Sequence, residues 1–128
     1  MQIENTTSAN SSYKFVILTL DSHSAGPVSR VQKKLSPYYP GLKISVHAAA
    51  EWAENPNSLI RAKQDIAEAN IVMANLLFLE EHVRAILPDL KSKRDSCDAI
   101  IGCISSKEIV SLTSMGRLDM GKPTTGFL

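Results

Sequence analysis

The sequence predicts one α/β domain built on an open, doubly wound parallel sheet, and three observations lead to this prediction. Strand-like and helix-like segments alternate along the chain, as they do in βαβ units with right-handed crossovers. Two strand-like segments, FVILTL and IVMANLL, are almost continuously apolar, which is typical of central strands covered on both faces. The length of 128 residues, with 44% hydrophobic and 21% charged residues, suits a single soluble globular domain.

Four strands are expected, and their connections predict the order 2-1-3-4 of a flavodoxin-like sheet. In the second strand, LKISVHA, apolar and polar residues alternate, which predicts an edge strand with one face partly wet. His47 lies on that wet face and is expected to be a surface residue. The four expected strands are Tyr13–Leu20, Leu42–Ala48, Asn70–Leu77 and Asp98–Ile104.

The first two helices have clear start signals. Gly26 and Pro27 open the first helix, because a proline in the first turn of a helix loses no hydrogen bond. The segment SPYYPG then ends this helix. Asn55 and Pro56 open the second helix in the same way, and an apolar stripe follows them. Both helices are therefore expected to connect parallel strands.

The third and fourth helices are less regular. The third runs through LEEHVRAILPDL, where Pro88 should kink or break it. The fourth begins with a capping box in which the Ser105 hydroxyl and the Glu108 carboxylate each accept a hydrogen bond from the other's backbone N–H. We expect this fourth helix to end at Gly116.

The two ends of the chain are expected to lie outside the regular fold. Residues 1–12, MQIENTTSANSS, are polar and without periodicity, which predicts a disordered tail before a domain over residues 13–128. The fourth strand is as apolar as the central strands, but only the turn-like segment GRLDMGKPTTGFL follows it. We therefore expect the domain to be truncated.

Charge and cysteine content exclude several classes of function. The net charge of +1 gives no sign of a nucleic-acid or membrane partner. No segment approaches the roughly 18 apolar residues of a transmembrane helix, and the chain lacks a signal segment, so a cytoplasmic location is expected. Cys97 and Cys103 have no second ligand pair at zinc-binding spacing and are expected to be buried free thiols.

Polar residues gather where ligands bind in this class of fold, at the carboxyl ends of the strands and at the point where strand order reverses. That point lies between the first and third strands, which the segments DSHSAG and LLFLEEH follow. The candidate contact residues for a ligand or partner are Asp21, Ser22, His23, Gly26, Glu80, Glu81 and His82.

A purely structural interpretation of these residues stands beside the functional one. Asp21 and Ser22 are suited to accept helix N–H groups, which would leave His23 simply exposed. Glu80 and Glu81 in the first turn of a helix meet its dipole favourably. The chain contains no G-x-G-x-x-G motif, phosphate loop or nucleophile elbow, so no catalytic residue and no bound metal are assigned.

The spacing D-x-H-x-x-G over Asp21, His23 and Gly26 resembles cobalamin-binding domains, in which the matching histidine ligates cobalt. Those domains continue with S-x-L after the third strand and Gly-Gly in the next. Here the segments Ala74–Leu76 and Gly102–Cys103 keep half of each later motif. The resemblance implies a tetrapyrrole-binding module in which His23 is the axial ligand.

A longer stretch of the chain resembles a different family. The strings VILTLDSHSAGPVSRVQKKLSPYYPGLKISVHAAAEWAENP and LFLEEHVRAILPDLKSKRDSCDA are similar to the N-terminal region of the large subunit of magnesium chelatase, its H subunit. The likeness extends from about Tyr13 to Met120, and it is strongest to the form found in anoxygenic photosynthetic bacteria.

This second resemblance implies a role in (bacterio)chlorophyll biosynthesis. The family's large subunit binds protoporphyrin IX and, with two smaller ATPase-related subunits, inserts Mg²⁺ in a reaction that uses ATP. Its porphyrin cavity belongs to later regions, so the chain alone is expected to be inactive and to bind no cofactor. The implied partners are the remainder of the large subunit, the two smaller subunits and protoporphyrin IX.

Overall fold

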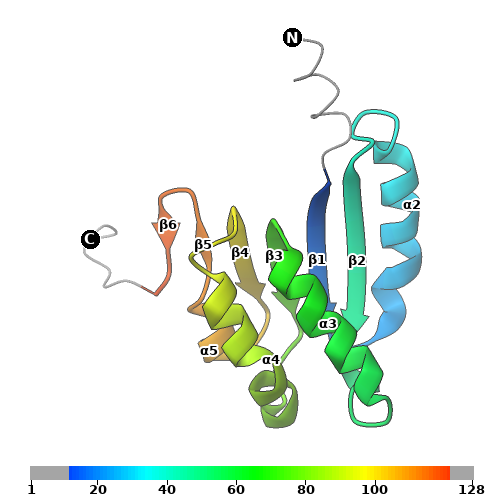
Figure 1. Cartoon of the computed structure of the whole chain (residues 1–128). Helices are drawn as coiled ribbons and strands as arrows, with labels where there is room; N and C mark the ends of the chain where they lie inside the picture. Colours follow the sequence, from blue (N-terminus) through cyan, green and yellow to red (C-terminus); the bar gives the residue numbers. More distant parts are fainter. Residues whose placement is uncertain (1–11, 122–128) are drawn as a thin grey trace.

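A parallel sheet with the expected strand order forms the centre of the computed structural model, which describes residues 12–121 (Figure 1). Its four longer strands lie in the order β2-β1-β3-β4, and all three pairings among them are parallel. The strands are β1 (Tyr13–Thr19), β2 (Leu42–Ala48), β3 (Ile71–Asn75) and β4 (Ala99–Cys103). Apart from Ser12, the tail expected over residues 1–12 lies outside the described residues.

Within residues 12–121 the sheet has six strands, so the expectation of four is corrected. A hairpin of β5 (Ser114–Met115) and β6 (Leu118–Asp119) adds two antiparallel strands beside β4. The turn between them contains Gly116 at φ +59°, a conformation that glycine adopts without strain. Strands of two residues are too short to show an alternating pattern, which is why the sequence did not reveal them.

The fourth helix is shorter than expected and begins one residue later. It is α5 (Lys107–Val110), and the chain from Ser114 onward forms the hairpin instead of reaching Gly116 as a helix. Ser106, not Ser105, caps the helix, because its hydroxyl accepts the Ile109 N–H at 3.4 Å. The expected capping box is therefore wrong: the Ser105 hydroxyl accepts the Leu77 N–H at 3.1 Å and ties two loops together.

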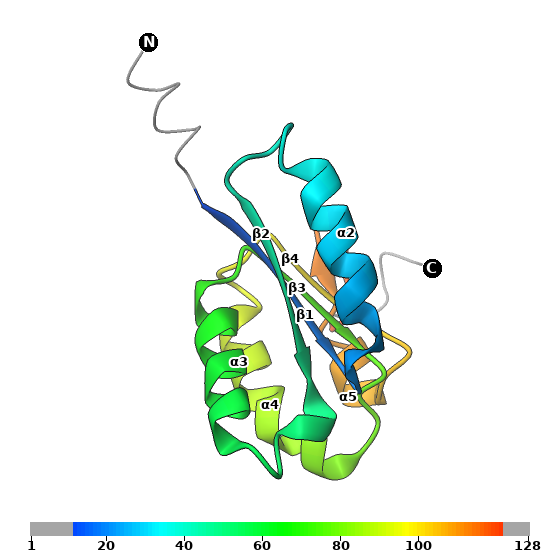
Figure 2. The ribbon, with the colours of Figure 1, turned by 90° about the vertical axis from the view of Figure 1, so that its right-hand side faces the viewer.

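Helices lie on both sides of the sheet, as the doubly wound prediction requires (Figure 2). On one side is α2 (Ala25–Leu35), which follows the short 3₁₀ helix η1 (Ser22–Ser24). On the other side are α3 (Pro56–Glu68), which follows η2 (Ala49–Glu51), and α4 (Glu80–Lys93). The α4 helix runs unbroken through Pro88, so the expected break does not occur. Its Ile86 and Leu90 are fully buried, and this packing offsets the missing proline N–H.

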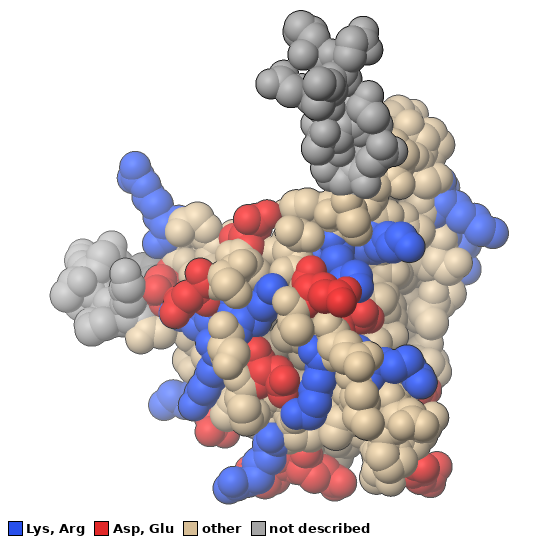
Figure 3. All heavy atoms as spheres, in the orientation of Figure 1, with Lys and Arg blue, Asp and Glu red and all other residues tan. Residues whose placement is uncertain are grey.

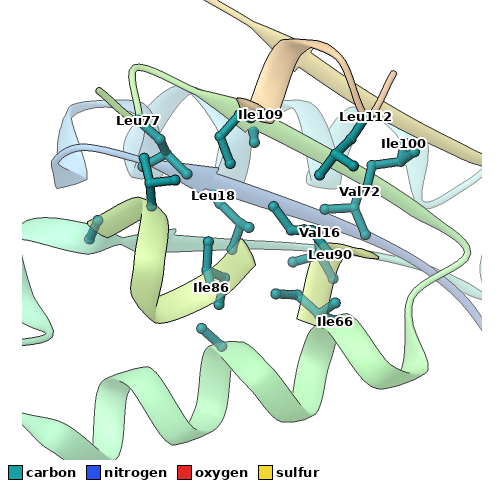
Figure 4. Close-up of a cluster of buried hydrophobic side chains, with 14 of the residues drawn as sticks. Val16, Leu18, Ile66, Val72, Leu77, Ile86, Leu90, Ile100, Ile109 and Leu112 are labelled. Carbon is teal, nitrogen blue, oxygen red and sulfur yellow. The ribbon is translucent and has the colours of Figure 1, made fainter. Parts of the chain in front are cut away.

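The hydrophobic core fills the space between the sheet and helices α3 and α4 (Figure 4). Strand residues Val16, Leu18 and Val72 are 0% exposed, and Ile66 of α3 and Ile86 of α4 pack with them. Burying side chains of this size contributes about 1.5–3 kcal/mol each. Most of the stabilising contacts of the domain are thus on one face of the sheet.

The open edge of the sheet is protected by a side chain of α2. The Gln32 amide donates a hydrogen bond to the Leu42 carbonyl at 2.8 Å and accepts one from the Ile44 N–H at 2.6 Å. The amide thereby takes the place of a neighbouring strand, which is one way in which proteins prevent edge-to-edge association. The prediction that β2 is an edge strand is confirmed.

Gly102 is required by a close approach between β4 and α5. A Cβ atom at this position would lie 2.4 Å from the Ile109 carbonyl oxygen and 2.8 Å from its carbonyl carbon. The buried Thr113 hydroxyl also binds the Gly102 peptide: it accepts from the N–H at 2.9 Å and donates to the carbonyl at 3.3 Å. Because backbone atoms cannot move aside cheaply, this position has no room for a side chain.

We predict that Gly102→Ala lowers the free energy of unfolding by about 3 kcal/mol, the upper part of the range for overpacked sites. Gly26→Ala is the matched control, because a Cβ there meets only the flexible Arg30 side chain at 3.7 Å and the site is helical. Chemical denaturation of both variants measures the difference. An equal effect of the two substitutions would contradict the argument.

Candidate functional site

The residues after β1 form a compact polar turn at the carboxyl edge of the sheet. The Asp21 carboxylate accepts the His23 N–H at 3.0 Å and contacts His23 Nδ1 at 2.7 Å through the same oxygen. The backbone hydrogen bond from His23, with help from its ring, lowers the pKa of Asp21. The His23 side chain is 91% exposed, so its Nε2 atom faces solvent. The turn therefore starts a helix and also presents an imidazole.

Gly26 is not required by the geometry of this turn. It lies in the first turn of α2 with no positive φ, and the nearest neighbour of a Cβ placed at this position would be the Arg30 side chain. Within the described residues, no backbone atom lies close enough to Gly26 to require a glycine there. Ser22 lies in η1 and is exposed, and Ser24, the N-cap residue of α2, makes no side-chain cap to that helix.

The candidates after β3 do not form one group with the Asp21 turn. Glu80 and Glu81 are exposed in the first turn of α4, and Glu80 accepts a hydrogen bond from Arg84. His82 points inward: it is 9% exposed and meets the ring of Trp52 edge-on, with centroids 6.1 Å apart. Each of these two rings keeps a buried nitrogen without a hydrogen-bond partner, His82 at Nδ1 and Trp52 at Nε1.

Two hollows at this edge lie between the ends of β1 and β2. The sequence had predicted the ligand site between the ends of β1 and β3. A hydrogen bond of 2.8 Å from the Ala50 N–H to the Leu20 carbonyl joins the two loops. One hollow has a volume of about 310 Å³ and is lined by Asp21, Ser22, Ala48, Ala50, Glu51, Glu54 and Asn55. A neighbouring hollow of about 290 Å³ is lined partly by His47, Trp52 and Arg61. His23, Glu80, Glu81 and His82 line neither.

A charged network beneath α3 has no signal in the sequence pattern. Asp65 of α3 accepts hydrogen bonds from His47 Nε2 at 2.6 Å, from Lys14 at 3.1 Å and from the Ser45 hydroxyl at 3.1 Å. The His47 side chain is 13% exposed, so the expectation of a surface histidine is wrong. Ser45 and His47, two polar residues of LKISVHA, instead face helix α3, which carries their partner Asp65. Burial would raise the pKa of Asp65, but the hydrogen bonds outweigh it and lower that pKa.

The loops after β3 and β4 are joined in an unusual backbone conformation. Leu76 and Ile104 have φ values of 62° and 46°, a region that bulky residues rarely adopt. The Leu76 N–H donates to the Ile104 carbonyl at 2.8 Å, and the Ser106 N–H donates to the Leu77 carbonyl at 2.9 Å. These bonds hold the two loops together at the carboxyl edge.

Neither metal-site geometry nor a membrane span is found in the part of the chain that the structure describes. Residues 12–121 contain no group of three or more His, Cys, Asp or Glu side chains that could hold a metal ion. None of the helices in this range is long and apolar enough to cross a bilayer. Cys97 and Cys103 are free, as expected, but both are half-buried and not fully buried.

The fold and this edge define a small doubly wound α/β domain whose polar loops are suited to binding. A family model described as a domain of unknown function, DUF3479, matches residues 14–128. Two relatives, the magnesium-chelatase H subunits of Cereibacter sphaeroides and Rhodobacter capsulatus, are each 52% identical over 114 residues. These matches cover 89% of this chain but only 10% of each relative. The chain belongs to the DUF3479 family, and its resemblance to the N-terminal region of magnesium-chelatase H subunits is confirmed.

The Asp65 network predicts a pH-dependent stability. Because the folded-state pKa of Asp65 is lowered, its stabilisation is present above its unfolded pKa of about 3.9 and is lost as pH falls through the folded value. Asp65→Asn should lower the free energy of unfolding at pH 7 by about 2 kcal/mol. The difference in free energy of unfolding between this variant and the unsubstituted chain should become smaller below about pH 4.

Urea denaturation across this pH range measures the effect. Glu68→Gln is the matched control, because Glu68 also pairs with Lys14 but its side chain is 69% exposed. An exposed pair of this kind contributes little. If the free energies of unfolding of Asp65→Asn and the unsubstituted chain differ by the same amount from about pH 7 to about pH 3, the carboxylate charge does not cause the stabilisation.

Proposed function

We propose that this chain is a non-catalytic N-terminal domain of the large subunit of magnesium chelatase, in the ATP-dependent insertion of Mg²⁺ into protoporphyrin IX. The observation that carries the proposal is the 52% identity over 89% of the chain to two magnesium-chelatase H subunits. The chain spans about a tenth of the length of these relatives, so the reaction belongs to a much larger protein.

The geometry supports a binding role more than a catalytic one. Inserting a metal into a porphyrin requires an enclosed apolar cavity and a base that accepts the pyrrole protons. The hollows of about 310 and 290 Å³ at the carboxyl edge are at the lower end of the range for small-molecule sites. Their lining includes Asp21, Glu51 and Glu54, which is unsuited to a flat apolar macrocycle.

A domain-exchange experiment in a related H subunit tests the proposal. In the H subunit of Cereibacter sphaeroides, the segment that matches this chain is replaced by residues 13–121, and a second protein lacks the segment. The exchanged subunit, with both smaller subunits, ATP and protoporphyrin IX, should form magnesium protoporphyrin at a rate within about threefold of the parent. The deleted subunit should be markedly slower. A folded but inactive exchange protein would contradict the proposal.

The chain by itself should not catalyse the reaction. Mixed with both smaller subunits, Mg²⁺, ATP and protoporphyrin IX, it should give no magnesium protoporphyrin above the control without protein. Fluorescence emission distinguishes the metallated from the free porphyrin. Formation of product above that control would show that the domain carries catalytic groups of its own.

A second candidate function is a cobalamin-type tetrapyrrole module, and one observation favours it. The contact of 2.7 Å between Asp21 and His23 Nδ1 leaves Nε2 exposed, as an axial ligand requires. We expect a titration of the chain with hydroxocobalamin to leave the visible spectrum unchanged. A spectral shift that His23→Ala abolishes and His47→Ala retains would support this second function instead.

A further inference from the structure

The face of the sheet opposite the core is a continuous apolar surface. Strand register joins Ile44, Phe15, Ile71, Ala99, Met115 and Leu118 in one row across all six strands. A second row joins Val46, Ile17, Met73 and Ile101. Neither row contains a charged residue. By contrast, the surface over α3 and α4 shows Lys and Arg interleaved with Asp and Glu (Figure 3).

This apolar surface is covered much less than the opposite face. Val16, Leu18, Val72, Ala74 and Ile100 on the core face are at most 2% exposed. The residues of the two apolar rows are half-buried with two exceptions: Ala99 is buried, and Met115 is 46% exposed. Since side chains alternate along a strand, the difference reflects what lies above each face.

One helix lies on this side of the sheet within residues 12–121, and it covers only one end. Helix α2 contacts β2 through Gln32 and has no fully buried residue. Helix α5 contacts Gly102, which alternates onto the same side as Ile100 and the core. The middle strands β1, β3 and β4 therefore have an apolar face without a helix above it in the described part of the chain.

We propose that this face, centred on Ile17, Met73 and Ile101, is the docking site for an amphipathic helix of about three turns that belongs to the same large-subunit polypeptide. The inference rests on the proposed function, because it takes the helix from that longer protein. Parallel strands occur almost only in sheets covered on both faces, so a β1-β3-β4 surface of this composition requires a cover.

The dimensions of the face fit one helix. Neighbouring strands lie about 4.8 Å apart, so β1 and β4 are separated by about 10 Å, the diameter of a helix with its side chains. Five-residue strands such as β3 and β4 are about 17 Å long, which corresponds to about eleven residues of helix.

The length of the relatives and the charge of α2 identify the occupant. About nine tenths of each relative lies outside the part that this chain matches, and a tethered helix binds without the entropy loss of free association. Helix α2, which borders the face, carries Arg30, Lys33 and Lys34 and no acidic residue. The docked helix is therefore expected to carry an apolar stripe, which faces the sheet, flanked by carboxylates that face the basic residues of α2.

Cys103 provides a probe of this face, because it alternates with Gly102 and follows Ile101 in the same strand. The chain and the exchanged large subunit are each treated with N-ethylmaleimide. The readout is alkylation, so it does not depend on chelatase activity. Tandem mass spectrometry then measures alkylation in the tryptic peptide over residues 95–107, in which Cys97 is the internal reference. Relative to Cys97, Cys103 should react at least tenfold more slowly in the large subunit than in the chain.

Two variants test whether the protection of Cys103 from alkylation depends on the apolar face of the sheet. Met73→Glu places a charge in the docking site and should restore Cys103 alkylation in the large subunit to the rate of the isolated chain. Ile60→Glu is the matched control, because Ile60 is a 50% exposed apolar residue of α3 and should leave protection unchanged. Circular dichroism of the chain checks that both variants fold.

Equal Cys103 rates in the chain and the large subunit would overturn the inference, whatever the exchange experiment on activity shows. Protection that survives Met73→Glu would also overturn it. If the isolated chain forms a dimer that Met73→Glu dissociates in sedimentation experiments, the face binds a second copy and the helix is excluded. Failure of the proposed function would appear separately, as an inactive exchange protein in which Cys103 is still protected.

Discussion

The domain depends on the register that turns Val16, Leu18 and Val72 toward helices α3 and α4. Side chains alternate with a period of two, so a slip of one residue would exchange the buried and the exposed faces of every strand. The same register places Ser45 beside Val16 and His47 beside Leu18. Those two polar residues therefore meet Asp65 of α3, and the core and the charged network are fixed by one constraint.

The carboxyl edge of the sheet combines rigid and solvent-exposed parts. Hydrogen bonds between the loops after β3 and β4 hold Leu76 and Ile104 at positive φ, a strain that persists only where neighbours determine the conformation. At the other end of this edge, His23 is exposed and oriented by Asp21. A firm edge with accessible polar groups is suited to holding a partner in a defined orientation.

The two faces of the sheet are covered to different extents. One face is covered, with α3, α4 and α5 packed against it. The other is apolar but only partly covered, which is consistent with a chain that spans a tenth of its relatives. The proposed helix, packed on the uncovered strands, would add to the stability of the domain.

The sequence by itself determined the four longer parallel strands, their order and the edge position of β2, because apolar runs and the alternation of strands with helices are local signals. It also located the Asp21 turn, since strand ends and helix starts have local signals. Only the tertiary structure decided that His47 pairs with Asp65, that His82 turns inward against Trp52, and that residues 114–119 form a hairpin. These outcomes depend on contacts between residues far apart in the chain, and such contacts leave no local pattern.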